Sequence, residues 1–379
     1  MSQNKMIFTH ASGGGSCAGK TTGQAHLVDY AEQLGFNVLL CPEAATLLFG
    51  SGIHRDQFLQ ENVLDFQISN EQFYKTAAQR LVETTGKPVI ISHDRGLLDG
   101  LAYLKDDVLF EKLLNKRGLS RSKILEGYYD SVTHLITAAK GALEHYNFEN
   151  NIHRTETPEE SNALDTDLQH AWLDAHGYEI IGNTLPDGTP KSFAQKMREY
   201  VTAVFNPLGL PSPVEHERRW TVSKKDFSPD IFLRQNVPVR KANILQTYVL
   251  PSSSWTEERV RLKLTEDGYI FLFHTKKRKT EASSKRVEKE GLVNQRLYEQ
   301  LLLHRDLTRM PVKKLRRSFI WEEQVFTLDE YDDPSRNYLK LELEGSRIDH
   351  AVLPEFLPIM EEVTDKQEYG EHYAAQILK

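Results

Sequence analysis

The sequence predicts two domains in series: an α/β domain with a parallel sheet and helices on both faces, then an antiparallel β-barrel that ends in helices. Short apolar runs alternate with longer helical patterns through the first half, three prolines cluster at 205–214, and short strands with period-two alternation follow. The 379 residues also exceed what one hydrophobic core usually organises. We expect domains at 1–206 and 215–379, joined by a proline-rich linker at 207–214.

The first half supplies the elements of the α/β domain in order. A helical pattern, TTGQAHLVDYAEQLG, follows the first apolar run, and a closing helix, SFAQKMREYVTAVFNPLG, ends the domain. Between them, QHAWLDAHGYEIIGNT predicts a helix and a final strand. The other predicted strands are KMIFTHA, FNVLLCPEA, KPVIISHD and SVTHLITAA.

The sequence pattern of the second half is typical of an antiparallel barrel, because turn-rich segments separate short strands. Its last stretches, LPEFLPIMEEV and KQEYGEHYAAQILK, have helical patterns. The predicted strands are VEHERRWTV, NILQTYVL, ERVRLKL, YIFLFHTKKRK, SFIWEEQVFTLDEY and YLKLELEG.

Composition narrows the class of protein. The net charge of -7 argues against nucleic-acid binding driven by overall charge. Cys17 and Cys41 are the only cysteines and lie in no metal-binding pattern, so a disulfide framework and structural zinc are not expected. The sequence contains no leader pattern and no run of 18 apolar residues, so we expect a cytoplasmic protein without a transmembrane segment.

A phosphate-binding P-loop follows the first predicted strand. Residues 14–21 match GxxxxGK[ST] between an apolar run and a helical pattern, which is the context that the motif requires. Backbone N–H groups would wrap the phosphates, Lys20 would reach the β- and γ-phosphates, and Thr21 would coordinate Mg²⁺. The predicted nucleotide-binding residues are Gly14, Gly15, Ser16, Cys17, Ala18, Gly19, Lys20, Thr21 and Thr22.

Two other strand ends carry candidate catalytic residues. Asp94 ends a hydrophobic strand, where a P-loop protein places a carboxylate that holds Mg²⁺ or activates the attacking group, and Arg95 follows it. Glu43 ends another strand, where a carboxylate can accept the proton of an acceptor hydroxyl. The alternative is that Glu43 only caps the helix that begins at Ala44.

These residues resemble the P-loop kinase-like NTPases related to nucleoside and ribosylnicotinamide kinases. The resemblance runs through PEAATLL, SHDRGLLDGLAY, HLITAA and NNIHRTETPEES. It implies that 94–96 with Asp99 form a DRG-type motif and that Arg154 is a lid arginine that neutralises charge during phosphoryl transfer. Alternatively, Arg154 is a surface residue paired with Glu156.

Charge recurs on one face of strand after strand in the second half. A solvated outer face is the ordinary explanation, but the alternate faces of these strands are not consistently apolar. A closed barrel with a polar interior resolves the conflict, because its cations would converge on a polyanion while its carboxylates hold bridging metal ions. The shared-face sets are Glu215, Glu217 and Arg219; Arg259, Arg261 and Lys263; and Glu342 and Glu344.

The charged strands resemble the CYTH, or triphosphate-tunnel, family. Residues 215–219 resemble its ExExK motif, with Arg219 in place of lysine, which keeps the charge but replaces a titratable amine with a planar fork. The resemblance implies that phosphates are held by Arg219, Arg259, Arg261, Lys277 (Lys276 if the strand phase is shifted by one), Arg286, Lys314 and Arg316. It implies that Mg²⁺ or Mn²⁺ is held by Glu215, Glu217, Glu288, Glu290, Asp329, Glu342 and Glu344.

The basic cluster 276–279 has alternative partners, RNA or anionic lipid headgroups. Its aromatic neighbours precede it rather than interleave with it, which argues against a stacking platform for single strands. We therefore expect no nucleic-acid partner and leave open a peripheral contact with anionic lipid.

The order of the two domains resembles the TRP-channel translocation-defect protein family, whose members are regarded as guanine-nucleotide- and phosphoinositide-binding trafficking factors. Two functions stay open. In the first, the chain is a phosphotransferase or NTPase with a triphosphate- or polyphosphate-binding tunnel; in the second, it is a regulatory protein that binds both ligands without turnover. The nucleotide is ATP or GTP, and the sequence has no NKxD-type guanine motif.

Overall fold

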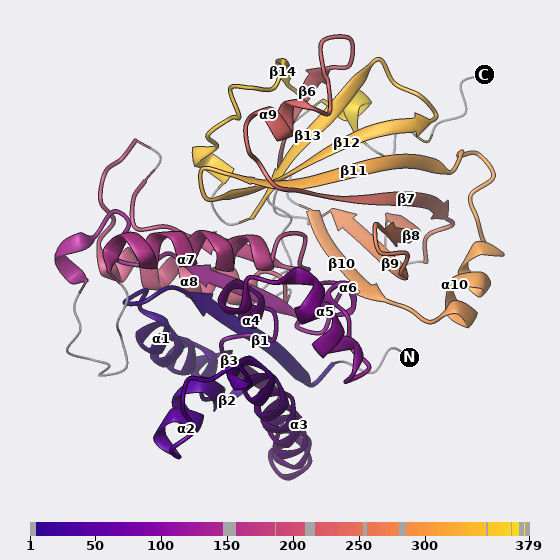
Figure 1. Cartoon of the computed structure of the whole chain (residues 1–379). Helices are drawn as coiled ribbons and strands as arrows, with labels where there is room; N and C mark the ends of the chain where they lie inside the picture. The colour runs from indigo at the N-terminus through magenta and orange to yellow at the C-terminus, as the bar shows by residue number, and fades with distance from the viewer. Residues whose placement is uncertain are drawn as a thin grey trace. The chain divides into compact units, whose positions relative to one another are not determined.

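The computed structural model describes residues 5–146, 157–185, 187–208, 217–252, 256–279, 286–345, 348–364, 366–370 and 375. The chain divides into two compact units, Met1–Leu208 and Gly209–Lys379 (Figure 1). The first is α/β with a parallel sheet and the second contains an antiparallel sheet, as the sequence predicts. In the described part of the chain, no helix combines the length and apolar character needed to cross a membrane.

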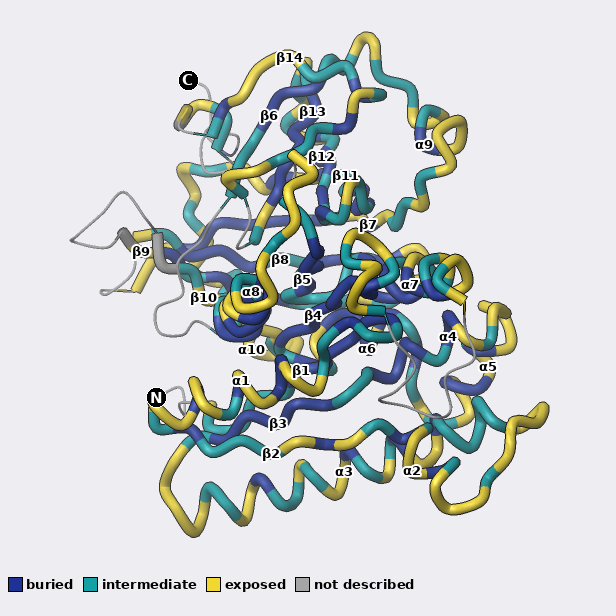
Figure 2. The backbone as a smooth tube through the Cα atoms, turned by 90° about the vertical axis from the view of Figure 1, so that its left-hand side faces the viewer, coloured by how far each residue is buried: buried dark blue, intermediate teal, exposed yellow. Residues whose placement is uncertain are grey.

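The first unit is built on a five-stranded parallel sheet in the order β2-β3-β1-β4-β5. Strands β3 and β4 are buried almost throughout, and Figure 2 shows them inside the unit. Such strands read as apolar runs because helices cover both of their faces. The strands are β1 (Ile7–Gly14), β2 (Asn37–Cys41), β3 (Val89–Asp94), β4 (Ser131–Leu135) and β5 (Tyr178–Ile181).

Helices cover this sheet on both faces. α1 and α8 pack together and contact the strands from one side, while α3 and α7 contact β1 from the other. The helices are α1 (Lys20–Gln33), α2 (Ala44–Gly50), α3 (Leu59–Thr85), α4 (Asp99–Leu104), α5 (Asp107–Asn115), α6 (Arg121–Leu125), α7 (Pro158–Ala171) and α8 (Phe193–Phe205), with a 3-10 turn η1 at Leu143–His145.

The second unit is a curled sheet of nine strands in the order β10-β9-β8-β7-β11-β12-β13-β6-β14. Its strands are β6 (Glu217–Ser223), β7 (Val239–Val249), β8 (Glu257–Thr265), β9 (Ile270–Lys279), β10 (Arg286–Leu292), β11 (Val312–Trp321), β12 (Gln324–Asp333), β13 (Tyr338–Glu344) and β14 (Ile359–Glu362). Its helical pieces are α9 (Ile231–Arg234), α10 (Gln295–Leu302), η2 (Ile348–His350) and η3 (Gln367–Tyr369).

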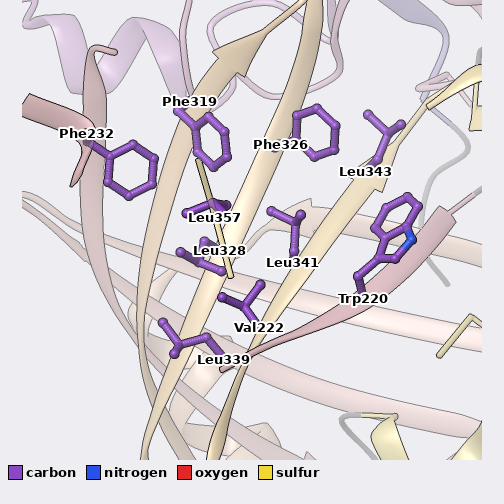
Figure 3. Packing of buried hydrophobic residues seen from close by; sticks show 10 residues of the cluster. All are labelled: Trp220, Val222, Phe232, Phe319, Phe326, Leu328, Leu339, Leu341, Leu343 and Leu357. Atoms are coloured by element: carbon purple, nitrogen blue, oxygen red, sulfur yellow. The ribbon is translucent and has the colours of Figure 1, made fainter. Parts of the chain in front are cut away.

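The main apolar core of the second unit lies on one face of this sheet. Side chains of β6 and β11–β13 pack there against α9 and the chain near Leu357 (Figure 3). Because side chains alternate along a strand, the opposite face receives the charged residues. The buried members are Trp220, Val222, Phe232, Phe319, Phe326, Leu328, Leu339, Leu341, Leu343 and Leu357.

The C-terminal stretch differs from the prediction. Residues 353–363 contain β14, which pairs with β6, rather than a helix. Pro354 and Pro358 explain the difference, since proline has no N–H group to donate within a helix. Beyond β14 the described residues form the short turn η3.

Candidate functional site

The P-loop lies between β1 and α1, as the motif requires. β1 ends at Gly14 and α1 begins at Lys20. Two residues of the loop have a left-handed backbone conformation, with φ of 56° at Cys17 and 92° at Gly19. A Cβ atom on Gly14 would lie 2.4 Å from the carbonyl oxygen of Leu135, so the first glycine is required by contact with β4.

Three of the predicted catalytic residues lie at the edge of the sheet where the P-loop begins: Asp94 pairs with Ser12 of β1, and Arg95, which follows it, is hydrogen-bonded to Glu43. Burial lowers the pKa of Lys20 and Arg95 lowers it further, while Asp94 and Glu43 act in the opposite direction. These interactions place one ammonium group within the field of two carboxylates and a guanidinium. Glu43, Asp94 and Arg95 lie at the carboxyl ends of neighbouring parallel strands, where ligands of such sheets bind.

Glu43 is at the N-cap position of α2, but its side chain caps nothing. One carboxylate oxygen instead accepts a hydrogen bond from Arg95 Nε at 2.7 Å, and the other accepts one from Thr46 Oγ1 at 2.7 Å. Burial alone would raise the pKa of Glu43, but attraction from Arg95 and Lys20 outweighs it and lowers the pKa to about 2. In this conformation Glu43 is an ionised partner of Arg95.

Arg95 occupies a strained position beside this pair. Its φ of 77° is unusual for a residue with a side chain. Its guanidinium also lies 3.6 Å from Asp99 Oδ2, and Asp99 Oδ1 accepts a hydrogen bond from Trp172 Nε1 at 2.6 Å. Arg95 is thus held between two carboxylates, and Trp172, the residue that follows α7, is hydrogen-bonded to one of them.

Asp94 has a carboxylate oxygen that could coordinate Mg²⁺. Its Oδ1 atom is buried and accepts no hydrogen bond from the described residues. Burial raises its pKa, which Lys20 counteracts. An unmatched carboxylate oxygen and the hydroxyl of Thr21 are hard oxygen ligands, so these residues fit Mg²⁺.

The second candidate site is the charged face of the curled sheet. In the β6–β13 pairing Arg219 lies opposite Glu342, and in the β9–β10 pairing Lys277 lies opposite Glu288. Lys277 therefore belongs to this face, whereas Lys276 contacts Glu258 on the other. The charged face comprises Glu217, Arg219, Glu257, Arg259, Arg261, Lys263, Lys277, Glu288, Glu290, Lys314, Arg316, Asp329, Lys340, Glu342 and Glu344.

Cations and carboxylates of this face are paired across strands. Asp329 is fully buried and accepts hydrogen bonds from Lys314 Nζ at 2.6 Å and from Arg316 Nε and Nη2, both at 2.8 Å. Glu288 lies 2.8 Å from Lys277 and 3.3 Å from Arg259. These pairs hold the pKa values of Asp329 and Glu288 below their usual range, against the opposing effect of burial.

Glu344 carries the clearest electrostatic strain. Its pKa is raised to about 7 because protein atoms surround it and because Glu342 and Glu217 repel it, with a contribution from Glu288. The residue is exposed at the end of β13.

The carboxylates of the charged face are the candidate metal ligands of the second unit. Among the described residues no three His, Cys, Asp or Glu side chains form a metal-binding group. The oxygen ligands suit Mg²⁺ or Mn²⁺, but most carboxylates are taken up by arginines and lysines. Glu215, Arg154 and the side chain of Arg286 lie outside the described residues.

Sequence reasoning left two cations out of the phosphate-binding set. Lys340 is fully buried and lies 2.8 Å from Glu342 Oε1. Period-two alternation could have found it, since it precedes Glu342 by two residues. Lys263 was placed on the shared face but not assigned a ligand, and it is buried there.

Comparison with known proteins supports the first site. Residues 11–187 match the family model described as an AAA domain. This match lies within the first unit and includes the P-loop. No curated protein matches the chain in sequence.

Solved structures resemble part of the chain only distantly. An inorganic triphosphatase shares 20% identity over 43% of this chain and 95% of its own, with a TM-score of 0.28. A protein from Pyrococcus horikoshii shares 16% identity over 35% of this chain and 78% of its own, with a TM-score of 0.25. A Pyrococcus furiosus protein shares 12% identity over 37% and 80%, with a TM-score of 0.26.

Proposed function

We propose that the first unit binds ATP or GTP with Mg²⁺ and transfers or hydrolyses the γ-phosphate, while the charged face of the second unit binds a triphosphate or polyphosphate with Mg²⁺ or Mn²⁺. The observation that carries the first half is that Asp94 pairs with Ser12, just before the P-loop, while Arg95 follows Asp94 and is hydrogen-bonded to Glu43. Phosphoryl transfer needs little beyond positioning and stabilisation of charge, and these groups supply both.

Each residue of the P-loop site has a role that follows from its charge. Lys20 would bind the β- and γ-phosphates, and Arg95 would stabilise charge that develops on the transferred group. A magnesium ion would neutralise phosphate oxygens, and Thr21 and Asp94 are the residues that would hold it. Glu43 would accept the proton of an acceptor hydroxyl only after its ion pair with Arg95 opens, because an ionised carboxylate with a pKa of about 2 is a weak base.

On the charged face, ligand binding would proceed by exchange of ion-pair partners. Phosphate oxygens would take over Lys277, Lys314 and Arg316 from their present carboxylates. The fully buried Asp329 and the half-buried Glu288 would then lose their counterions, which is costly unless a cation replaces them. A divalent metal that arrives with the polyphosphate provides that cation, so ligand and metal would bind together.

One observation favours the regulatory alternative. Both candidate sites have their carboxylates engaged by cations in this structure, at Glu43 and at Asp329. Such a site can hold a phosphorylated ligand, for example a phosphoinositide headgroup, without catalysing its turnover. Nucleotide binding would then act as the regulatory signal.

Turnover and binding by the full chain separate these functions. Purified protein would be incubated with ATP, GTP, tripolyphosphate and a panel of nucleosides, with Mg²⁺ or Mn²⁺. Lys20→Ala should abolish nucleotide turnover, and Lys277→Ala should weaken tripolyphosphate binding or cleavage; Lys75→Ala, on the exposed surface of α3, is the matched control. Nucleotide binding without turnover would favour the regulatory function, and absence of binding would refute the proposal.

A further inference from the structure

Three buried side chains hold the outer side of the P-loop backbone. Asp165 Oδ1 on α7 accepts a hydrogen bond from Gly15 N at 2.9 Å. Thr137, just after β4, donates its hydroxyl to Ser16 O at 2.6 Å. Lys196 on α8 donates from Nζ to Ala18 O at 2.9 Å. Three elements distant in sequence therefore fix three successive stretches of the loop.

The three side chains belong to one buried network. Asp165 Oδ1 also accepts a hydrogen bond from Thr137 N at 3.1 Å, and Lys196 also donates to Ile136 O at 2.8 Å. Asp165 is 1% exposed and Lys196 is 5% exposed, so neither is available to solvent. The network thus sets a rigid frame around the segment 136–137.

The planar peptide bond turns these contacts into an orientation of the loop amides. In a trans peptide the C=O group and the following N–H group point in opposite directions. Since Ser16 O points to Thr137 and Ala18 O points to Lys196, the N–H groups of Cys17 and Gly19 face away from the network.

The first peptide of the loop shows which side is opposite. Gly15 N points to Asp165, and the carbonyl of the same peptide, Gly14 O, accepts a hydrogen bond from Lys20 Nζ at 3.4 Å. The side away from the network is therefore the side of Lys20. Amides aimed there form a concave set of donors beside an ammonium group, which is an anion-binding arrangement.

We infer that Asp165, Thr137 and Lys196 are positioning residues that pre-orient the P-loop amides for phosphate. This inference rests on the proposed nucleotide-binding function and adds residues that the motif does not contain. Pre-orientation strengthens binding because the loop does not have to be ordered when the ligand arrives. The three residues act through the loop and do not contact the phosphates themselves.

Thr137 allows the most specific test, because one substitution removes its hydroxyl while keeping the side-chain shape and another keeps the hydroxyl. Thr137→Val removes the hydroxyl and leaves the Ser16 carbonyl without that donor, whereas Thr137→Ser keeps the donor. Binding would be measured on the full chain with MANT-ATP and MANT-GTP in Mg²⁺, counting only the signal that Lys20→Ala abolishes. We expect about a tenfold weaker affinity for Thr137→Val, equivalent to about 1.4 kcal/mol, and an affinity within about threefold of wild type for Thr137→Ser.

Thr133→Val is the matched control. Thr133 is a fully buried threonine of β4 whose hydroxyl has no hydrogen-bond partner in the part of the chain that the structure describes. The same substitution there should leave nucleotide affinity unchanged. Thermal unfolding of all variants shows whether a loss of affinity merely follows a loss of stability.

A second pair keeps the test decisive if Thr137→Val does not fold. Asp165→Ala removes the acceptor for Gly15 N and should weaken binding about tenfold or more, while Asp165→Asn keeps an acceptor oxygen and should bind like wild type. Asp167→Ala, an exposed aspartate two residues away on α7, is its control. Unchanged affinity in both Thr137→Val and Asp165→Ala overturns the inference alone, whereas a wild type that binds neither nucleotide overturns the proposed function as well.

Discussion

Replacement of Asp329 by alanine tests whether the charged face is balanced as the structure describes. The carboxylate is fully buried and accepts hydrogen bonds from Lys314 and from two guanidinium nitrogens of Arg316. Its removal takes a buried counterion away from Lys314, whose side chain is also 0% exposed. Loss of one partner of a buried pair costs about 3–5 kcal/mol. For a unit of this size the midpoint of thermal unfolding should fall by about 6–20 °C.

Calorimetric unfolding of the full chain with and without tripolyphosphate is the assay. Lys314 and Arg316 would no longer be paired with Asp329 and should bind the anion more strongly, so tripolyphosphate should raise the unfolding temperature of Asp329→Ala more than that of wild type. Asp332→Ala, on the exposed end of the same strand, should change neither value. A variant as stable as wild type, or one that tripolyphosphate stabilises less than wild type, would refute this description of the pair.

Three further changes test other parts of the structure. Burial raises the pKa of Glu71 from 4.5 to about 7. The contribution of Glu71 to stability is therefore present below pH 4.5 and is lost as the pH rises through about 7. Denaturant titrations across this pH window should show that wild type loses about 3 kcal/mol of unfolding free energy relative to Glu71→Gln. Gly96→Ala would place a Cβ 2.4 Å from the Trp172 ring, and the overpacking should cost about 1–3 kcal/mol and reduce nucleotide turnover. Phe326→Ala should lower the unfolding free energy of the second unit by about 3–5 kcal/mol, measured by urea titration, because it opens a cavity in the main apolar core of that unit.

The local and periodic features of the molecule could be predicted from the sequence. The P-loop is a contiguous motif with its strand and helix on either side, and the parallel strands appear as apolar runs because both faces are covered. Period-two alternation placed Arg259 and Arg261 on one face, and the β8 pairing agrees with that placement. Each of these signals is contained within a few residues of chain.

Features that join distant segments could not be read in this way. Asp165 meets Gly15 across 150 positions of the chain, and nothing in the local pattern around Asp165 marks it. The ion pair of Glu43 with Arg95 depends on the order β2-β3-β1 in the sheet. The apolar core of the second unit also escaped prediction, because its buried strand residues come from β6 and β11–β13 and the other strands of the sheet do not repeat that pattern.

Isothermal titration of the full chain with MgATP, MgGTP and tripolyphosphate tests most directly whether one chain holds two phosphate sites. We predict two independent sites: Lys20→Ala should remove the nucleotide site and leave tripolyphosphate binding intact, and Lys277→Ala should weaken tripolyphosphate binding without changing the affinity for nucleotide. A single site for all ligands, or loss of both binding events in Lys20→Ala, would contradict the account.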